Sequence, residues 1–196
     1  RGEALARFMD AGGLRAGLAA RTTWNEAFPL VAPPPTPDGL GVILLDSNAE
    51  THFSFTNALG IVGMEQLRAA EAAMDEWPQA RWLVALHHHL AEYPRPGTAL
   101  ADRIGTALVN GHWVLGRLRR RAARIVVLHG HRHIDWMGRS EGLRILSAPS
   151  PVMGALDVEA RHFWLHALGS AADGGLALLA PRRIEVPGVR PLDDGG

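Results

Sequence analysis

Most of the histidines in this chain are concentrated in two short segments. Residues 87–89 are three consecutive histidines, whereas His129, His131 and His133 occupy alternate positions, and each segment directly follows an apolar run. Neutral imidazole is the side chain that most often binds metals in proteins. The chain contains no cysteine, so a transition-metal site would have to use histidine and carboxylate ligands. The two segments therefore predict a metal site built on imidazole.

The alternate spacing suggests how the second segment would bind metal. On a strand, side chains at positions i and i+2 point to one face, with Cα atoms roughly 7 Å apart. This distance is wide for one ion but suits a pair of ions about 3.5–4 Å apart, the arrangement common in phosphatases and nucleases. We therefore expect His131 and His133 to bind different ions, with Gly130 allowing the chain to turn. The isolated histidines are interpreted as surface residues or hydrogen-bonded core residues: His52, His112, His162 and His166.

Three apolar runs place these groups at the ends of strands. We expect strands over residues 40–45, 81–86 and 124–128, and the first of them ends in Asp46, Ser47 and Asn48. The remaining patterns predict helices over residues 3–21, 63–77 and 99–122, a proline-rich loop over residues 31–39, and several short strands after residue 133. Gly105, Gly111 and Gly116 weaken the third helix, so we expect it to be interrupted. Strands that alternate with helices and are followed by strands in series predict a layered α/β fold, with a mixed sheet covered by helices. In such sheets ligands bind at the carboxyl ends of the strands.

Composition limits the classes of protein that fit. The chain has 196 residues, is 47% hydrophobic and carries a formal net charge of zero. A balanced charge gives no electrostatic reason to expect a nucleic-acid or anionic-membrane partner, and no apolar run approaches the roughly 20 residues that span a bilayer. No signal peptide is visible after Arg1. We expect one domain over residues 1–190, a loose tail over residues 191–196, and a cytoplasmic protein.

Several motifs resemble one enzyme family. "GHRH" at residues 130–133 resembles the Gly-His-x-His motif of calcineurin-like metallophosphoesterases, and "VALHH" at residues 84–88 resembles the preceding strand of that family, which ends in His-His. Three further segments resemble family motifs in the same order: "GVILLDSN" at 41–48, "GIVGMEQLRAAEAAM" at 60–74, and "LRILSAPSP" at 143–151. The resemblance covers residues 28–152.

The resemblance implies a fold, an activity and a set of ligands. The fold would be a two-sheet sandwich flanked by helices. The activity would be hydrolysis of a phosphomonoester or phosphodiester by a hydroxide formed on two divalent ions such as Mn, Fe or Zn. His87 and His131 would bind one ion and His133 the other, with His131 and His133 forming part of the catalytic centre. "HHHL" lacks the proline usual after His-His, so His88 and His89 remain alternatives to His87.

His129 precedes the Gly-His-x-His motif, and we expect it to support the ligands or to lie on the surface.

The first half of the family pattern is missing from this chain. The motifs Asp-x-His, Gly-Asp-x-x-Asp and Gly-Asn-His do not occur. We therefore expect the chain to be the C-terminal part of a metallophosphoesterase domain, with a small phosphoester as substrate and the N-terminal half as a candidate partner. Two alternatives stay open. One is a non-catalytic module of the same fold that binds proteins, and the other is a single zinc ion held by three histidines and a water.

Overall fold

A computed structural model describes residues 27–48, 59–91, 108–151 and 161–186 of the chain. Several of the predicted features lie outside these ranges. They are the helix over residues 3–21, residues 99–107 of the third helix, His52 and the tail over residues 191–196.

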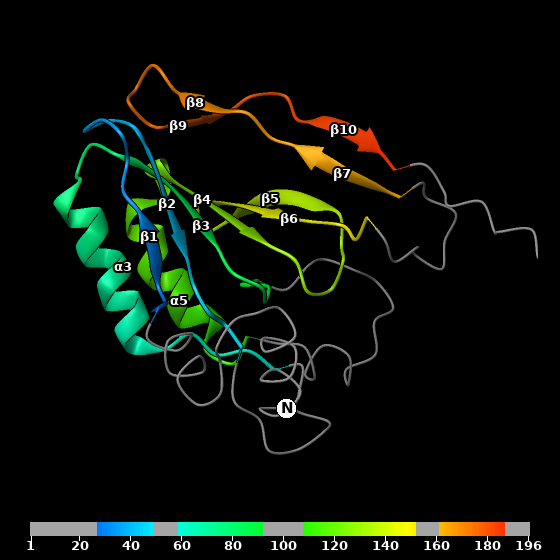
Figure 1. The fold of residues 1–196 in the computed structure, drawn as a ribbon, viewed down its shortest axis with the longest axis horizontal. Helices are drawn as coiled ribbons and strands as arrows, with labels where there is room; N and C mark the ends of the chain where they lie inside the picture. Colours follow the sequence, from blue (N-terminus) through cyan, green and yellow to red (C-terminus); the bar gives the residue numbers. More distant parts are fainter. Residues whose placement is uncertain (1–26, 49–58, 92–107, 152–160, 187–196) are drawn as a thin grey trace, which may run out of the picture.

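A six-stranded sheet forms the centre of the fold (Figure 1). Its strands lie in the order β1-β2-β3-β4-β6-β5. The inner strands β2, β3, β4 and β6 are parallel, and the two edge strands β1 and β5 are antiparallel to their neighbours. The bounds are β1 Leu30–Ala32, β2 Leu40–Leu44, β3 Arg81–Ala85, β4 Ile125–His129, β5 Trp136–Ser140 and β6 Leu143–Ser147. The predicted α/β class with a mixed sheet is confirmed.

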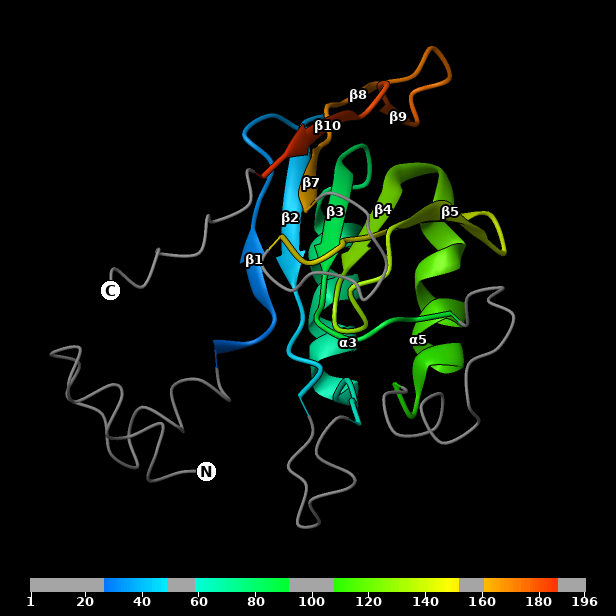
Figure 2. The same ribbon diagram turned by 90° about the vertical axis from the view of Figure 1, so that its right-hand side faces the viewer.

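Two helices cover one face of this sheet (Figures 1 and 2). Helix α3 (Met64–Glu76) connects β2 to β3, and helix α5 (Gly111–Leu118) precedes β4 through the 3₁₀ segment η2 (Arg119–Arg124). The predicted apolar stripe of α3 is buried against the sheet together with one side of α5. Fully burying one such aliphatic side chain contributes about 1.5–3 kcal/mol. The buried residues of the layer include Leu67, Ala70, Met74, Val114, Leu118, Ile43, Val84, Val127 and Ile145.

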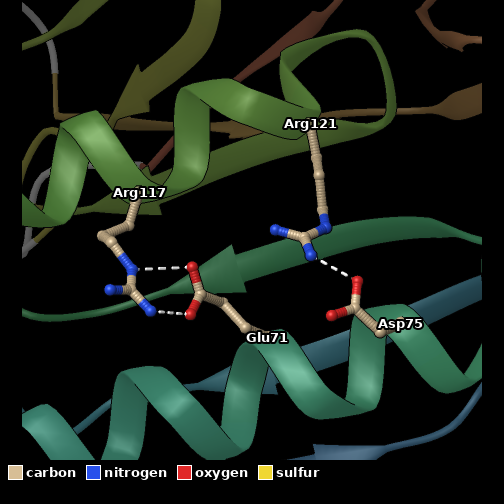
Figure 3. Close-up of polar contacts among 4 residues, drawn as sticks. All are labelled: Glu71, Asp75, Arg117 and Arg121. Carbon is tan, nitrogen blue, oxygen red and sulfur yellow. Dashed lines mark hydrogen bonds and ion pairs between the residues drawn. The ribbon is translucent and has the colours of Figure 1, made fainter.

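Ion pairs tie the two helices together on their outer side (Figure 3). Arg117 of α5 donates through Nε to Glu71 of α3 at 2.7 Å and forms a second contact through its terminal nitrogen. The Arg117 guanidinium also lies 5.4 Å from the centroid of the Trp113 ring, and Arg121 pairs with Asp75. The arginines that end this helical region therefore act as structural contacts on the surface.

Two short ribbons lie on the other side of the sheet. β7 (His162–Leu165) pairs with β10 (Arg182–Glu185), and β8 (Leu168–Ser170) pairs with β9 (Leu176–Leu178). Apolar side chains of β8 and β9 pack against β4, β5 and β6, whereas leucines of β1 and β2 are exposed. Each ribbon has two strands, so the two-sheet sandwich implied by the resemblance stays a prediction.

One predicted element was wrong in part. The loop predicted over residues 31–39 begins later, because residues 31 and 32 belong to β1 and pair with β2. The interruption expected in the helix over residues 99–122 is present in the described residues, because α5 starts only at Gly111 and Leu108 forms a bridge to Gly60. The amide of Asn110 exchanges two hydrogen bonds with the backbone of Val62, which holds the chain away from a helical path before α5. In the described part of the chain, no helix has the length and apolar character to cross a membrane.

Candidate metal centre

Both histidine segments reach the same edge of the sheet, as the sequence predicted. Residues 87–89 follow β3, and His129 ends β4, which leads into the turn of residues 130–135. Ser47 and Ser147, at the ends of β2 and β6, lie at this edge as well. Because these four strands are parallel neighbours, their carboxyl ends bring the histidines and serines together.

His87 and His131 contact each other directly. His87 Nε2 lies 2.9 Å from His131 Nδ1, and the two ring centroids are 4.7 Å apart. The His88 ring packs on the same group, 4.4 Å from that of His131. Zinc binds imidazole nitrogen at about 2.0–2.1 Å with tetrahedral angles, so two ligands of one ion have nitrogens roughly 3.3 Å apart. The His87 and His131 nitrogens would have to separate by a few tenths of an ångström to share an ion.

The protonation of His87 also favours ligation. Burial lowers the pKa of His87 below its ordinary value of 6.5, and the charge of His133 lowers this pKa further. An imidazole must be neutral to bind a metal. The surroundings of His87 therefore keep it in the ligating form at neutral pH, and they place His133 within electrostatic reach.

The geometry expected for His131 and His133 was wrong. The strand ends at His129, and His131 and His133 adopt left-handed conformations with φ of 69° and 52°. Arg132 N–H donates to Gly130 O at 2.9 Å, so the turn expected at Gly130 is present and tight, but the strand-like spacing expected for His131 and His133 does not hold. Non-glycine residues with positive φ cost about 1 kcal/mol or more each, and such residues cluster at functional sites.

The structure separates His87 from its two neighbours. His87 is exposed, whereas His88 and His89 are buried, with His88 only 2% exposed. Ser47 Oγ lies 2.9 Å from His88 Nδ1 and accepts the backbone N–H groups of His87 and His88 at 3.2 Å each. With both lone pairs of the hydroxyl occupied, its proton is directed to His88 Nδ1. This geometry favours His87 as the ligand and His88 as part of its support.

A side-chain amide holds the end of β2 in the same network. Gln66 of α3 accepts from Asp46 N–H at 2.9 Å and donates to Asp46 O at 3.0 Å. Asp46 and Ser47 are consecutive, so α3 fixes the backbone that presents the Ser47 hydroxyl. Gln66 lies in the family-like segment at residues 60–74, but the sequence alone did not indicate this contact.

His129 is a buried residue, not a surface one. It is 4% exposed, and burial lowers its pKa from 6.5 to about 4. A backbone hydrogen bond with Gly130 partly opposes this shift, and the charge of His89 adds to it. His129 is therefore neutral at physiological pH and is buried at the end of β4, with its ring centroid 6.5 Å from that of His89.

The exit of the turn is held at two points. Ser147 Oγ donates to Ile134 O at 2.6 Å inside the protein. The carboxylate of Asp135 accepts from His162 Nε2 at 2.7 Å and from Trp164 Nε1 at 2.8 Å. The interpretation of His162 as a hydrogen-bonded core residue is confirmed, but its partner was missed because Asp135 and His162 lie far apart in the sequence.

The residues present fit part of a metal centre. His87 and His131 offer two nitrogens within a few tenths of an ångström of the separation that a shared ion needs, and His133 is exposed in the same turn. Within residues 27–48, 59–91, 108–151 and 161–186, no group of three or more His, Cys, Asp or Glu side chains gathers closely enough to hold an ion. The described part of the chain therefore brings two imidazole nitrogens together without an acidic ligand beside them.

Comparisons with known proteins give a distant likeness in structure alone. No family model matches the chain, and no curated protein matches it. Among solved structures, the chain is similar to a candidate 5′-nucleotidase from Staphylococcus aureus determined in complex with α-ketoglutarate, with a TM-score of 0.43 and 14% sequence identity. The match covers 82% of this chain and spans 30% of the length of that structure.

Proposed function

We propose that this chain carries the histidine half of a metal-dependent phosphoester hydrolase, with His87, His131 and His133 as metal ligands. The observation that supports the proposal most strongly is the 2.9 Å contact between His87 Nε2 and His131 Nδ1, because these two residues come from separate segments of the sequence. The order of the family-like motifs supports the same conclusion. The complete centre would hold two divalent ions, and the acidic ligands would come from outside the described residues.

The chain's own residues contribute binding and orientation. His87 and His131 present ring nitrogens at one point, and Ser47 fixes the backbone of His87 through its amide. His133 follows in the left-handed turn, exposed to solvent. Divalent ions bound here would polarise a phosphoryl group and lower the pKa of a water that attacks phosphorus as the ester oxygen leaves.

The proposal is tested by hydrolysis on the full-length gene product. We expect p-nitrophenyl phosphate or its bis-ester to be hydrolysed in the presence of Mn²⁺, and we expect His131→Ala to reduce kcat at least a hundredfold and to reduce the bound metal. His112→Ala is the matched control, because His112 is an exposed histidine of α5. Equal activity and equal metal content in the His131→Ala and His112→Ala proteins would contradict the proposal.

A second function is favoured by the same contact. Two imidazoles 2.9 Å apart can form a hydrogen bond with each other, so the pair is satisfied without a metal. This favours a non-catalytic module that keeps the fold and uses this edge to bind a protein. A full-length protein that folds, holds no divalent ion and hydrolyses neither ester would support this second function over the first.

A further inference from the structure

We propose that Asp135 is a positioning residue, which fixes the turn carrying His131 and His133 to the β7/β10 ribbon. This inference rests on the proposed function, because it concerns how the candidate ligands are held. It adds a role for the ribbon, which otherwise has no part in the site.

Both oxygens of the Asp135 carboxylate are engaged. Oδ2 accepts from His162 Nε2 at 2.7 Å, and Oδ1 accepts from Trp164 Nε1 at 2.8 Å. His162 and Trp164 are two residues apart on β7, so both side chains point to the same face of the ribbon. Two ring N–H donors from one face fix the orientation of the carboxylate as well as its position.

The partners of His162 determine which of its nitrogens donates. Arg183 of β10 contacts His162 Nδ1 at 3.3 Å, and a guanidinium can only donate. His162 Nδ1 is therefore the acceptor, and Nε2 carries the hydrogen that is donated to Asp135. His162 is only 4% exposed, whereas Asp135 is exposed, so water competes least at the His162 end of this chain of contacts.

The turn needs this support because of its backbone. His131 and His133 are held at positive φ, which side-chain-bearing residues adopt at a cost. At its entry the turn is held by Gly130 N–H donating to His87 O at 3.1 Å. At its exit the holding contacts are those of Ile134 with Ser147 and of Asp135 with the ribbon. Loss of the Asp135 contacts would let the two histidines relax and turn their imidazoles away from His87.

Asp135→Asn tests this role in the full-length protein. The substitution keeps the side chain's size but removes its charge and replaces one acceptor oxygen with an amide NH₂ group, which can only donate. We expect the imidazole ¹⁵N signals of His131 and His133 to shift in the metal-free protein. We also expect the affinity for Zn²⁺, measured by calorimetry, to fall about tenfold or more, the scale seen when groups that orient metal ligands are removed.

Asp75→Asn is the matched control. It makes the same chemical change in the ion pair with Arg121 between α3 and η2, on the helix side of the sheet. We expect it to change neither the imidazole signals nor the zinc affinity. Unchanged signals in Asp135→Asn, or equal changes in both variants, would overturn the positioning role.

Two further outcomes keep the test decisive. If Asp135→Asn does not fold, Trp164→Phe removes one of the two donors to Asp135 while keeping an aromatic side chain. The His131 and His133 imidazole signals of this variant then test the positioning role. If the wild-type protein binds no zinc, the proposed function fails, and the metal-free signals still decide whether Asp135 positions the turn.

Discussion

The two histidine segments at the edge of the sheet are held in different ways. The segment after β3 is fixed from inside the core, where Ser47 contacts two backbone amides and the His88 ring. The segment after β4 leaves the core at His129 and turns through two left-handed residues. It is held at its exit by Ser147 and by a ribbon from the other side of the sheet.

This difference suggests a division of roles. The first segment presents His87 from a rigid base, since the next two histidines are buried. The second segment presents His131 and His133 from a turn in which both adopt positive φ. Changes in the core, which includes His129 as well as the supports of the first segment, should therefore act on stability, and changes at the ribbon should act on the geometry of the second segment.

The largest expected effect on stability comes from lowering the pH, which protonates His129 at the start of the second segment. His129 has a pKa of about 4 in the folded metal-free protein against 6.5 ordinarily. The unfolded chain therefore binds this proton first as pH falls, so stability is full above about pH 6.5 and is lost down to about pH 4. The loss from this group amounts to roughly 3 kcal/mol. Urea unfolding at several pH values should show a smaller loss in His129→Gln, and an NMR titration midpoint near 6.5 for His129 would contradict the prediction.

The next largest effect on stability should come from overpacking the His88 ring, which supports the first segment. A Cβ added at Gly60 would lie 2.4 Å from His88 Cγ, and the His88 ring is held by Ser47. We expect Gly60→Ala to destabilise the protein by roughly 2–3 kcal/mol through overpacking. Gly116→Ala is the control, because a Cβ in that part of α5 meets nothing within 4 Å. It should stabilise the helix by about 0.5–1 kcal/mol. Thermal or urea unfolding measures both, and equal effects would mean that the His88 ring can move freely.

The smallest effects compare the two serines directly. Ser47→Ala removes a hydroxyl with three partners, so we expect a loss of about 2 kcal/mol. Ser147→Ala removes a hydroxyl that donates to Ile134 O, so we expect a loss of about 1 kcal/mol. Urea unfolding of the two variants gives the difference. A larger loss of unfolding free energy for Ser147→Ala would mean that the second segment, not the first, is the more firmly held.

The strands could be predicted from sequence because their apolar runs are short and bounded by polar residues. The strands expected over residues 40–45 and 81–86 each end one residue earlier in the structure. The alternation of buried and less buried residues along β3 also distinguishes the three histidines that follow it. Trp82 and Val84 are buried on the helix side, and the same alternation continues through Leu86 to His88. Counting by twos from Trp82 would have placed His88 in the core and His87 outside it.

The turn after β4 could not be read in the same way. Alternation was assumed to continue through His131 and His133, but the strand ends at His129 and the backbone changes hand. The contacts of Asp135 are with His162 and Trp164 of β7, which lie far along the chain. A local sequence pattern does not predict such a long-range contact. Sequence therefore predicted which histidines meet, but not the conformation that brings them together.

An anomalous-difference map from crystals of the full-length gene product grown with Zn²⁺ tests the central claim most directly. The account predicts a peak bound by His87 Nε2 and His131 Nδ1, about 2.0–2.1 Å from each nitrogen. It also predicts a second peak beside His133. A map without a peak at these residues, with His87 and His131 still 2.9 Å apart and hydrogen-bonded to each other, would contradict the claim that this edge is a metal centre.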